Sequence, residues 1–210
     1  MRFGVEQKIP MAQAVQKIKF SEFESERLIF RKFCEDDFSV LYSWRKDTEN
    51  MGYRRDGVKT EEETRQHLEW IIAEASADEC ESLWFAVARK DDNKLIGEGI
   101  LLHMPENPEM GWLVGKDHWQ QGYGTEIGHA LLKFCFQTLN LRRIIAACHV
   151  DNHASYKLME KIGMRREAHF IQEKLYGDVW CDRYQYAILR DEWLIIQQKQ
   201  NSLMPWHPSR

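Results

Sequence analysis

Two glycines separated by one residue, Gly122 and Gly124, mark the stretch of this 210-residue chain with the clearest chemical potential. They lie between a short strand pattern over 109–114 and a run of apolar residues at one-face helical spacing over 127–139. A glycine loop that ends at a helix N-terminus points successive backbone N–H groups at one place, and the positive end of the helix dipole adds to their effect. The pattern therefore indicates a site for an anion such as a pyrophosphate, with a plain turn as the alternative.

The same stretch departs from two other phosphate-binding patterns. No Gly-Lys-Ser/Thr follows the glycines, so the loop is not a Walker P-loop. Its third glycine is misplaced for a Rossmann fingerprint, and no acidic residue ends a following strand at the usual distance. We therefore expect neither of those two modes of nucleotide binding.

Size and composition bound the class of protein. With 43% hydrophobic and 30% charged residues, the chain resembles a soluble globular protein with one well-buried domain. A net charge of −4 and the lack of a basic stripe give no reason to expect a nucleic-acid partner. Five widely spaced cysteines without a Cys-x-x-Cys pair predict neither a zinc site nor a disulfide framework. Because the sequence shows no membrane-spanning apolar run and no signal-peptide pattern, we expect a cytoplasmic protein without a membrane partner.

Apolar periodicity and turn residues predict the elements that must position the glycine loop. One helix is expected after Asp36 or Asp37, either of which can cap it, and another after Thr60, which forms a capping-box pattern with Glu63. Between these two helices a loop is expected over 50–58. Strands are predicted over 27–31, 83–89, 95–103, 109–114, 142–150, 166–173 and 179–189, and further helices over 127–139, 152–163 and 191–198. This order predicts a mixed α/β sandwich in one domain.

Four linked motifs resemble those of the GNAT superfamily of N-acetyltransferases. The loop is similar to the family's Gln/Arg-x-x-Gly-x-Gly/Ala motif for acetyl-CoA, but it has Trp119 in the first position. Trp followed by Gly-Tyr-Gly-Thr-Glu resembles instead the Rim-type subfamily, which acetylates the N-termini of ribosomal proteins. The other motifs of that subfamily are matched by Glu26, Arg27, Leu28 and Arg31, by Asn152, Ser155, Glu160, Lys161 and Gly163, and by Asp182, Tyr186, Glu192 and Trp193.

The resemblance implies a fold and a domain extent. The fold would be the GNAT acyl-CoA N-acyltransferase fold, in which a central, mostly antiparallel sheet is splayed at the cofactor site and flanked by helices. The matched motifs span about 22–195, so 1–21 would be an N-terminal extension and 196–210 a C-terminal tail. A monomer or a homodimer is expected.

The resemblance also implies where acetyl-CoA would bind. Its pyrophosphate would meet the backbone N–H groups of Gln120, Gln121, Gly122, Tyr123, Gly124 and Thr125. Its pantetheine arm would pair with the strand edge at Trp112, Leu113 and Val114, and an N–H near Leu113 would donate to the thioester carbonyl. Asn152 would hydrogen-bond the cofactor, cap the helix that follows, or do both. No metal is expected.

The catalytic residues are harder to assign. Many GNAT enzymes use a tyrosine to protonate the departing thiolate, and alignment of the motif places Met159 at that position. Ser155 is the candidate acid in its place and Tyr156 the second, with a packing hydroxyl as the plain interpretation of Ser155. For the base, Glu109 stands where Rim-type relatives carry a glutamate. Glu98 is its competitor, and a solvated carboxylate is the plain alternative.

The acceptor pocket of this fold would lie between 38–58 and the last hairpin. Trp44, Tyr53, Trp180 and Asp182 are candidates to line it, although aromatic residues at such spacing are more often core. The acceptor would be a peptide N-terminus or a small amine, a polyamine or an antibiotic among them. A non-catalytic acyl-CoA-binding sensor is the alternative from another functional class. His118, His149 and His153 show no metal-ligand spacing with acidic residues.

Overall fold

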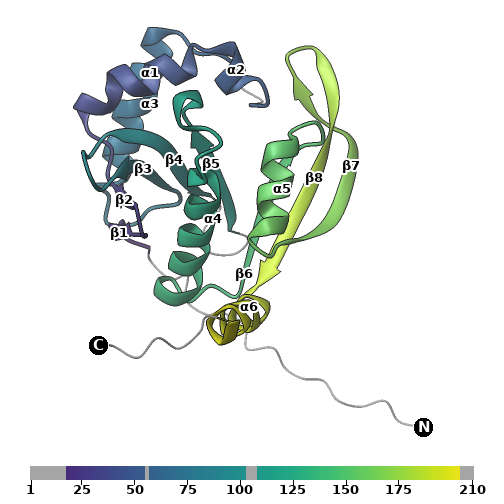
Figure 1. Ribbon diagram of the computed structural model, residues 1–210. Coiled ribbons are helices and arrows are strands. Elements are labelled where there is room, and N and C mark those ends of the chain that lie inside the picture. The colour runs from purple at the N-terminus through teal and green to yellow at the C-terminus, as the bar shows by residue number, and fades with distance from the viewer. Residues whose placement is uncertain (1–17, 55–56, 103–107, 204–210) are drawn as a thin grey trace, which may run out of the picture.

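Eight strands build one sheet in the order β1-β2-β3-β4-β5-β6-β8-β7 (Figure 1). The computed structural model describes residues 18–54, 57–102 and 108–203. All neighbouring strands are antiparallel except β5 and β6, which are parallel. The strands are β1 (Phe23–Glu24), β2 (Leu28–Arg31), β3 (Leu83–Arg89), β4 (Leu95–Leu102), β5 (Glu109–Val114), β6 (Arg143–His149), β7 (Arg165–Tyr176) and β8 (Val179–Leu189).

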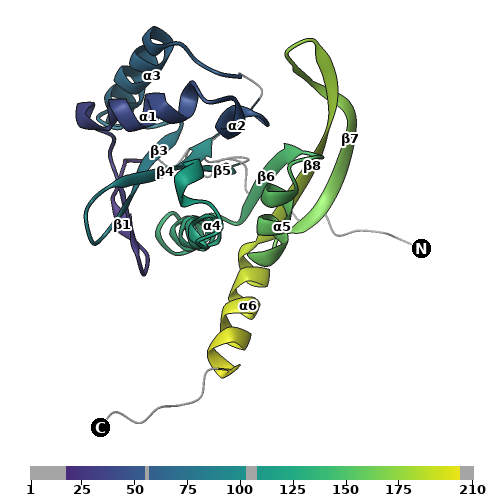
Figure 2. The same ribbon diagram turned by 45° about the horizontal axis from the view of Figure 1, so that its top comes forward.

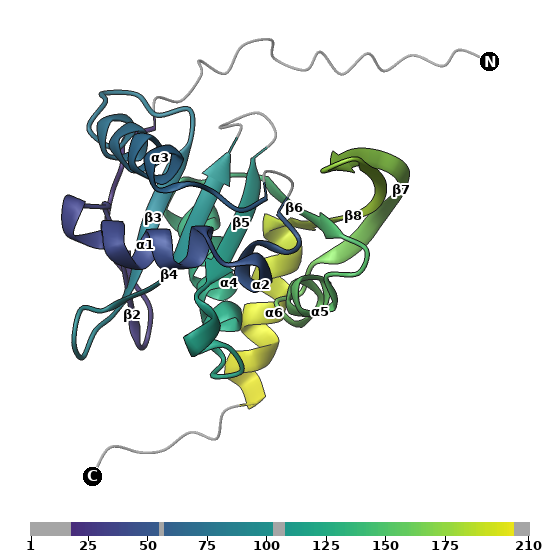
Figure 3. The ribbon, with the colours of Figure 1, turned by 90° about the horizontal axis from the view of Figure 1, so that it is seen from above.

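Helices cover both faces of this sheet. On one side of β3–β5 lie α1 (Phe38–Arg45), α2 (Thr48–Met51) and α3 (Glu61–Glu74), and on the other lies α4 (Tyr123–Lys133) (Figure 2). Seen from above, α5 (His153–Lys161) lies against the part of the sheet formed by β6 and β8 (Figure 3). The last helix, α6 (Arg190–Leu203), follows β8 directly.

The alternation of side chains along β4 separates two buried clusters. Gly97 and Gly99 face α4, since a Cβ on Gly99 would stand 3.3 Å from the Cδ2 atom of Leu131. The residue between them, Glu98, therefore faces the α1–α3 side. The larger cluster lies between the sheet and α4, with Ile127 and Leu131 fully buried. The smaller cluster lies under α1 and α3.

Two helical glycines let α4 and α5 approach each other closely. A Cβ on Gly124 would stand 2.9 Å from Leu158 Cδ1, and a Cβ on Gly128 would stand 3.0 Å from Ile162 Cδ1. Gly124 lies inside the first turn of α4, and its backbone is not left-handed. Its lack of a side chain therefore serves helix packing, a role that the sequence did not indicate.

The sequence predicted the fold class and most elements. The mixed α/β class, the mostly antiparallel sheet and its splay are confirmed, as is the capping box of Thr60 and Glu63. Two short elements were not expected: β1, and α2, which Asp47 caps through hydrogen bonds from the N–H groups of Glu49 and Asn50. Elements of two to four residues are too short to show a period, which explains why the pattern misses them.

The described structure continues on both sides of the predicted domain bounds, 22 and 195. Ile18 is 95% buried in the core and its carbonyl accepts from the Cys80 N–H at 2.9 Å, although 1–21 was expected to be an extension. Likewise α6 runs past the expected end at 198. The remainder of the proposed extension and tail, 1–17 and 204–210, lies outside the described residues. Among the described helices, none has the length and apolarity needed to cross a membrane.

We predict that Gly128→Leu destabilises the fold by wedging α4 away from α5. The new side chain would meet Ile162 and Leu158, and overpacking of this kind costs about 1–3 kcal/mol. Lys133→Leu places the same side chain on an exposed position of the same helix and is the control. Urea unfolding should show a lower midpoint for the first variant and little change for the second. Equal midpoints would mean that the close helix contact is unimportant for stability.

Candidate active site

In the described part of the chain, β5 and β6 share a single register pair, Glu109 with Ile145. Beside it, the Ile145 N–H donates to the Pro108 carbonyl at 3.0 Å. Past this point the strands diverge, while β5 stays paired with β4 and β6 with β8 (Figure 1). The divergence leaves the facing edges of β5 and β6 without a strand partner there.

A cavity of about 800 Å³ lies at this divergence. Its walls come from β5, β6, the glycine loop, the start of α5, the segment around α2 and the β7–β8 hairpin. Gln121 and Thr125 contribute no lining surface in the described structure. The other residues predicted for the site do line it: Glu109, Trp112, Leu113, Val114, Gln120, Gly122, Tyr123, Gly124, Asn152 and Ser155.

The glycine loop has the geometry of an anion site. Gly122 precedes α4 in the left-handed conformation with φ of 82°, which favours glycine, and Gln120 is left-handed too with φ of 60°. The Glu126 N–H donates to the Gly122 carbonyl at 3.1 Å. The N–H groups of 123–125 therefore precede the first bonded turn and have no intrahelical acceptor. Together with the helix dipole they fit a phosphate group.

A carboxylate–guanidinium contact anchors this loop to a segment 99 residues earlier in the chain. Glu126 accepts hydrogen bonds from Ser25 Oγ, the Arg27 N–H and Arg27 Nε, each at 2.7 Å. Arg27 also donates to the Gln121 carbonyl at 3.2 Å and places its guanidinium 4.3 Å from the Tyr123 ring centre. Burial opposes ionisation of Glu126, but these hydrogen bonds outweigh it and lower its pKa. Both residues belong to the motifs that resemble the family, but nothing in the sequence indicates that they touch.

Only every second residue of β5 points its backbone N–H and carbonyl groups toward the open edge of the strand. The Leu113 carbonyl faces β4, because a Cβ on Gly97 of that strand would stand 2.5 Å from its oxygen. In a strand, the N–H and carbonyl of one residue point the same way, so the Leu113 N–H faces β4 as well. The N–H groups that face the cavity side belong to Trp112 and Val114. The backbone N–H that was expected near Leu113 to donate to the thioester carbonyl must therefore belong to one of these neighbours.

The Trp119 side chain hydrogen-bonds to one backbone carbonyl on that open edge. Its indole Nε1–H donates to the Val114 carbonyl at 2.7 Å, and 41% of the residue stays exposed. A ligand that pairs along β5 would meet this indole at the end of the strand. The residue that departs from the general family motif is therefore part of the cavity wall.

The start of α5 presents polar groups to the same cavity. Asn152 caps the helix, as its sequence position predicted, because its Oδ1 accepts from the Ser155 N–H at 3.0 Å. Its side-chain NH₂ is then the group that can donate to a ligand. The Ser155 hydroxyl lies beside the Cys148 thiol, whose pKa burial raises to about 11. Met159 also lines the cavity, but its thioether carries no proton, so that position supplies no acid.

The two candidate bases have opposite environments. Glu98 is 99% buried, does not line the cavity, and accepts from Arg45 Nη2 at 3.1 Å. Burial alone would raise the pKa of Glu98, but the charges of Arg45 and Arg54 lower it. Glu109 lines the cavity, and within the described residues no hydrogen bond or ion pair occupies its carboxylate. Of the two, Glu109 can reach a substrate.

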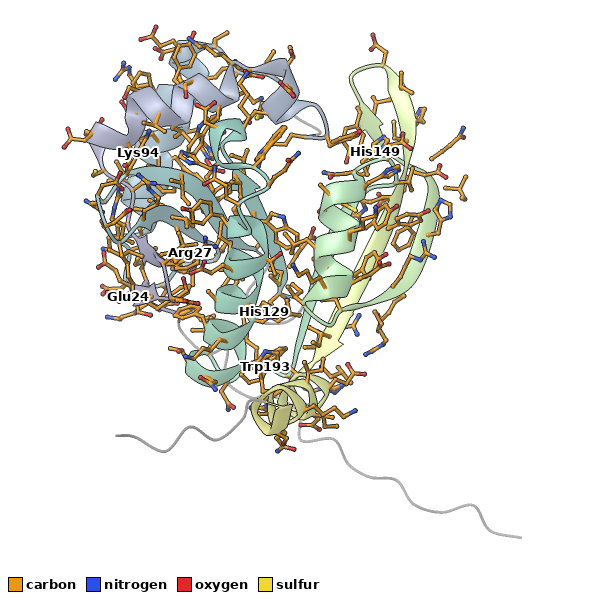
Figure 4. The ribbon with its side chains drawn as sticks, viewed as in Figure 1. Glu24, Arg27, Lys94, His129, His149 and Trp193 are labelled. Atoms are coloured by element: carbon orange, nitrogen blue, oxygen red, sulfur yellow. The ribbon has the colours of Figure 1, made fainter. Side chains whose placement is uncertain are left out.

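The acceptor side differs from expectation in its aromatic lining. Tyr53 does line the cavity, and the His149 ring lies 5.6 Å from it and 5.1 Å from the ring of Tyr176 on the hairpin. Figure 4 shows His149 beside that hairpin. The other candidates are elsewhere: Trp44 is core, and Trp180 is 58% exposed outside the cavity.

Asp182, also expected in the acceptor pocket, is bound within the hairpin. Its carboxylate accepts from the Gln172 N–H at 2.9 Å and contacts His169 Nε2 at 2.7 Å. Asp182 does belong to the last hairpin, beside which the acceptor pocket was expected, but residues of β7 hold its side chain. In the described residues, no group of three His, Cys, Asp or Glu side chains is placed to hold a metal ion.

We predict that Glu126→Gln lowers the free energy of unfolding at neutral pH by about 1–2 kcal/mol. This is the lower part of the range for hydrogen bonds to a charged group, because Arg27 is about half exposed and solvent screens the contact. This corresponds to a fall in Tm of about 2–8 °C. The folded-state pKa of Glu126 lies below its ordinary 4.5, so the wild-type advantage should be complete above that pH and disappear as the pH falls through the folded value.

The control for this variant is Glu24→Gln, which removes an exposed ion pair with Lys90. It should change Tm by less than about 2 °C. Thermal unfolding of both variants and the wild type across pH 3–7 measures the difference. A deficit for Glu126→Gln that stays constant down to pH 3 would contradict a role for its charge.

Comparisons with known proteins agree with this geometry. The family model described as "Acetyltransferase (GNAT) domain" matches residues 27–165. The chain is 36% identical to the uncharacterized N-acetyltransferase YnaD of Bacillus subtilis over 171 residues, which cover 80% of this chain and 97% of that protein. A crystal structure of a GNAT-family acetyltransferase from Bacillus anthracis is 34% identical, with a TM-score of 0.74, and covers 81% of this chain and 99% of that one.

More distant structures share the fold alone. Spermidine N-acetyltransferase from Vibrio cholerae, solved with CoA and spermine, is 20% identical with a TM-score of 0.70 and covers 80% of this chain and 98% of that one. The extent of the family match and the identity to YnaD go further than fold. The splayed sheet, the glycine loop and these matches together show that this chain belongs to the GNAT family of acetyl-CoA-dependent N-acetyltransferases.

Proposed function

We propose that the chain moves an acetyl group from acetyl-CoA directly to a primary amine within a ternary complex, with Glu109 as the base. The observation that carries this proposal is the convergence on one cavity of the loop N–H groups, the open β5 edge and an unengaged carboxylate. Each supplies something that the reaction needs: the loop binds an anion, the β5 edge offers a hydrogen-bond donor to the thioester carbonyl, and the carboxylate accepts a proton.

The chain's own residues divide the donor-binding work. The N–H groups at the start of α4 fit the pyrophosphate, and the N–H of Trp112 or Val114 would stabilise negative charge that develops on the thioester oxygen. The Asn152 NH₂ would hold the donor near α5. Because both substrates would be held side by side, proximity supplies a large part of the rate enhancement.

Proton handling would use residues on opposite sides of the cleft. Glu109 would take a proton from the amine, directly or through water, since its carboxylate lines the cavity on the α1–α3 face of the sheet. Ser155 would deliver a proton toward the departing thiolate, because it lies at the start of α5 and also lines the cavity. Tyr156 is less suited, since it packs against Tyr184 and His153 instead of lining the cavity.

The acceptor we propose first is a protein N-terminal amine. The four motifs shared with Rim-type sequences support it, including the Arg27 and Glu126 positions that the structure joins. Small amines, polyamines and antibiotics remain the alternatives within the enzyme class. Assay of thiol release from acetyl-CoA against representatives of each class, with CoA binding by calorimetry, tests the proposal. Binding of CoA without turnover of any acceptor would favour a sensor.

We predict that Glu109→Gln lowers kcat about 10²–10⁴-fold at pH 7, because general-base catalysis contributes that much and the amide cannot accept the proton. The KM for acetyl-CoA should change little, since the carboxylate would face the acceptor. The decisive comparison is the pH–rate profile: the deficit should shrink at high pH, where the amine deprotonates without help. Unchanged kcat would remove Glu109 from the mechanism.

We predict that Gly122→Val raises the KM for acetyl-CoA more than tenfold while kcat falls less. Valine is strained at φ of 82° and would displace the loop N–H groups. Gly177→Val introduces the same side chain at another left-handed glycine, with φ of 57° and open space around it, in the β7–β8 turn. Steady-state kinetics with varied acetyl-CoA should separate the two variants. Equal effects would show that strain alone, and not the anion site, explains the loss.

A further inference from the structure

Positively charged side chains gather on the cavity wall away from the donor-binding loop. Lys174 and Arg183 of the β7–β8 hairpin line the cavity, as does Arg54 from the segment after α2. The neighbour of Arg183 on β8, Tyr184, packs against Tyr156 of α5 with ring centres 5.8 Å apart. Because side chains alternate along a strand, Arg183 faces away from α5, on the acceptor side of the sheet.

The hairpin cations exceed the negative charge beside them. The Glu173 carboxylate contacts Arg183 at 3.1 Å from Nη2 and 2.9 Å from Nε, and Lys174 Nζ lies 3.7 Å from the same carboxylate. Two cations therefore share one anion within the described residues. Arg183, with 17% of its side chain exposed, is paired with Glu173 directly, so the positive charge in excess belongs to the pair's neighbour Lys174, of which 36% is exposed.

The acids that line the cavity lie elsewhere. Glu49 is 4.0 Å from Lys116 Nζ, and Glu109 is the proposed base on β5. His118 also lines the cavity, but burial lowers its pKa, so it is neutral at pH 7. The acceptor side thus holds one acid suited to an amine and a separate cationic wall on the hairpin.

We propose that the acceptor carries a carboxylate close to its amine, and that Lys174 and Arg183 bind this carboxylate. The inference rests on the proposed transfer to an amine at Glu109. Charged donors to a carboxylate form strong, oriented hydrogen bonds, and Arg54 adds attraction from the opposite wall. A polyamine would bring further positive charge toward this wall and would be repelled. The carboxylate belongs either to a free amino acid or to an acidic residue near a peptide N-terminus.

The test compares acceptors with and without a carboxylate near the amine, each pair at saturating acetyl-CoA and at several pH values, because an amide also lowers the pKa of the adjacent amine. Free alanine and phenylalanine are paired with their amides, Ser-Glu peptides with Ser-Gln peptides, and spermidine represents polyamines. We expect kcat/KM to be about tenfold to a hundredfold higher for the carboxylate member of at least one pair. The pair that responds identifies the source of the carboxylate. Equal rates within both pairs, or a preference for spermidine, would overturn the proposal.

Charge reversal at Lys174 tests the site itself. Lys174→Glu should raise the KM for the preferred carboxylate acceptor about tenfold or more and leave the KM for acetyl-CoA unchanged. Lys133→Glu makes the same charge change on an exposed part of α4 and is the control for long-range effects. Arg183→Lys, which keeps the charge, should lose less than Arg183→Gln.

Two results would separate failure of this inference from failure of the proposed function. If Lys174→Glu raised the KM for acetyl-CoA instead, the cations would serve the donor phosphates and the inference would be wrong while the transferase function stood. If the wild type bound no CoA and released no thiol with any acceptor, the proposed function itself would fail. Circular dichroism of each variant at the assay temperature confirms that a loss of rate is not a loss of fold.

Discussion

The whole active-site arrangement depends on the divergence of two parallel strands. Unpaired N–H and carbonyl groups along a strand are unfavourable when buried, so a sheet that opens must give them other partners. Here the Trp119 indole takes the Val114 carbonyl, and the other open groups face a cavity. Close packing of α4 against α5 at Gly124 and Gly128 brings the starts of both helices to this cavity.

Charge organises the two ends of this cleft in different ways. At the glycine loop, the Glu126 carboxylate accepts hydrogen bonds from the Arg27 N–H and guanidinium, and the loop N–H groups stay available for the phosphate that we propose. At the acceptor end, Glu173 neutralises only part of the hairpin's positive charge. In the proposed function the two substrates would therefore be bound by different means, the donor by backbone N–H groups and the acceptor by side-chain cations.

The two glutamates on neighbouring strands show how environment decides a role. Glu98 and Glu109 lie on the same face of the sheet, which the register of β4 with β5 establishes. Glu98 lies under α1, where Arg45 reaches its carboxylate, and removing either partner would leave an uncompensated buried charge. Glu109 lies where the sheet opens, and no cation in the described ranges pairs with its carboxylate. The surroundings of each side chain thus make Glu98 a structural ion-pair partner and leave Glu109 available for the role of base that we propose.

The sequence by itself determined the fold class, most strands and helices, the glycine loop and part of the set of residues that line the cleft. These follow from local causes: periodicity reports which face is buried, and a glycine before a helix reports a left-handed turn. Only the tertiary structure decided which charged side chains pair with each other. Arg27 and Glu126 are 99 residues apart, Arg45 and Glu98 are 53 apart, and no local pattern encodes such contacts. The direction of the N–H groups along β5 likewise depends on which strand pairs on which side, so that Trp112 and Val114, and not Leu113, face the cavity.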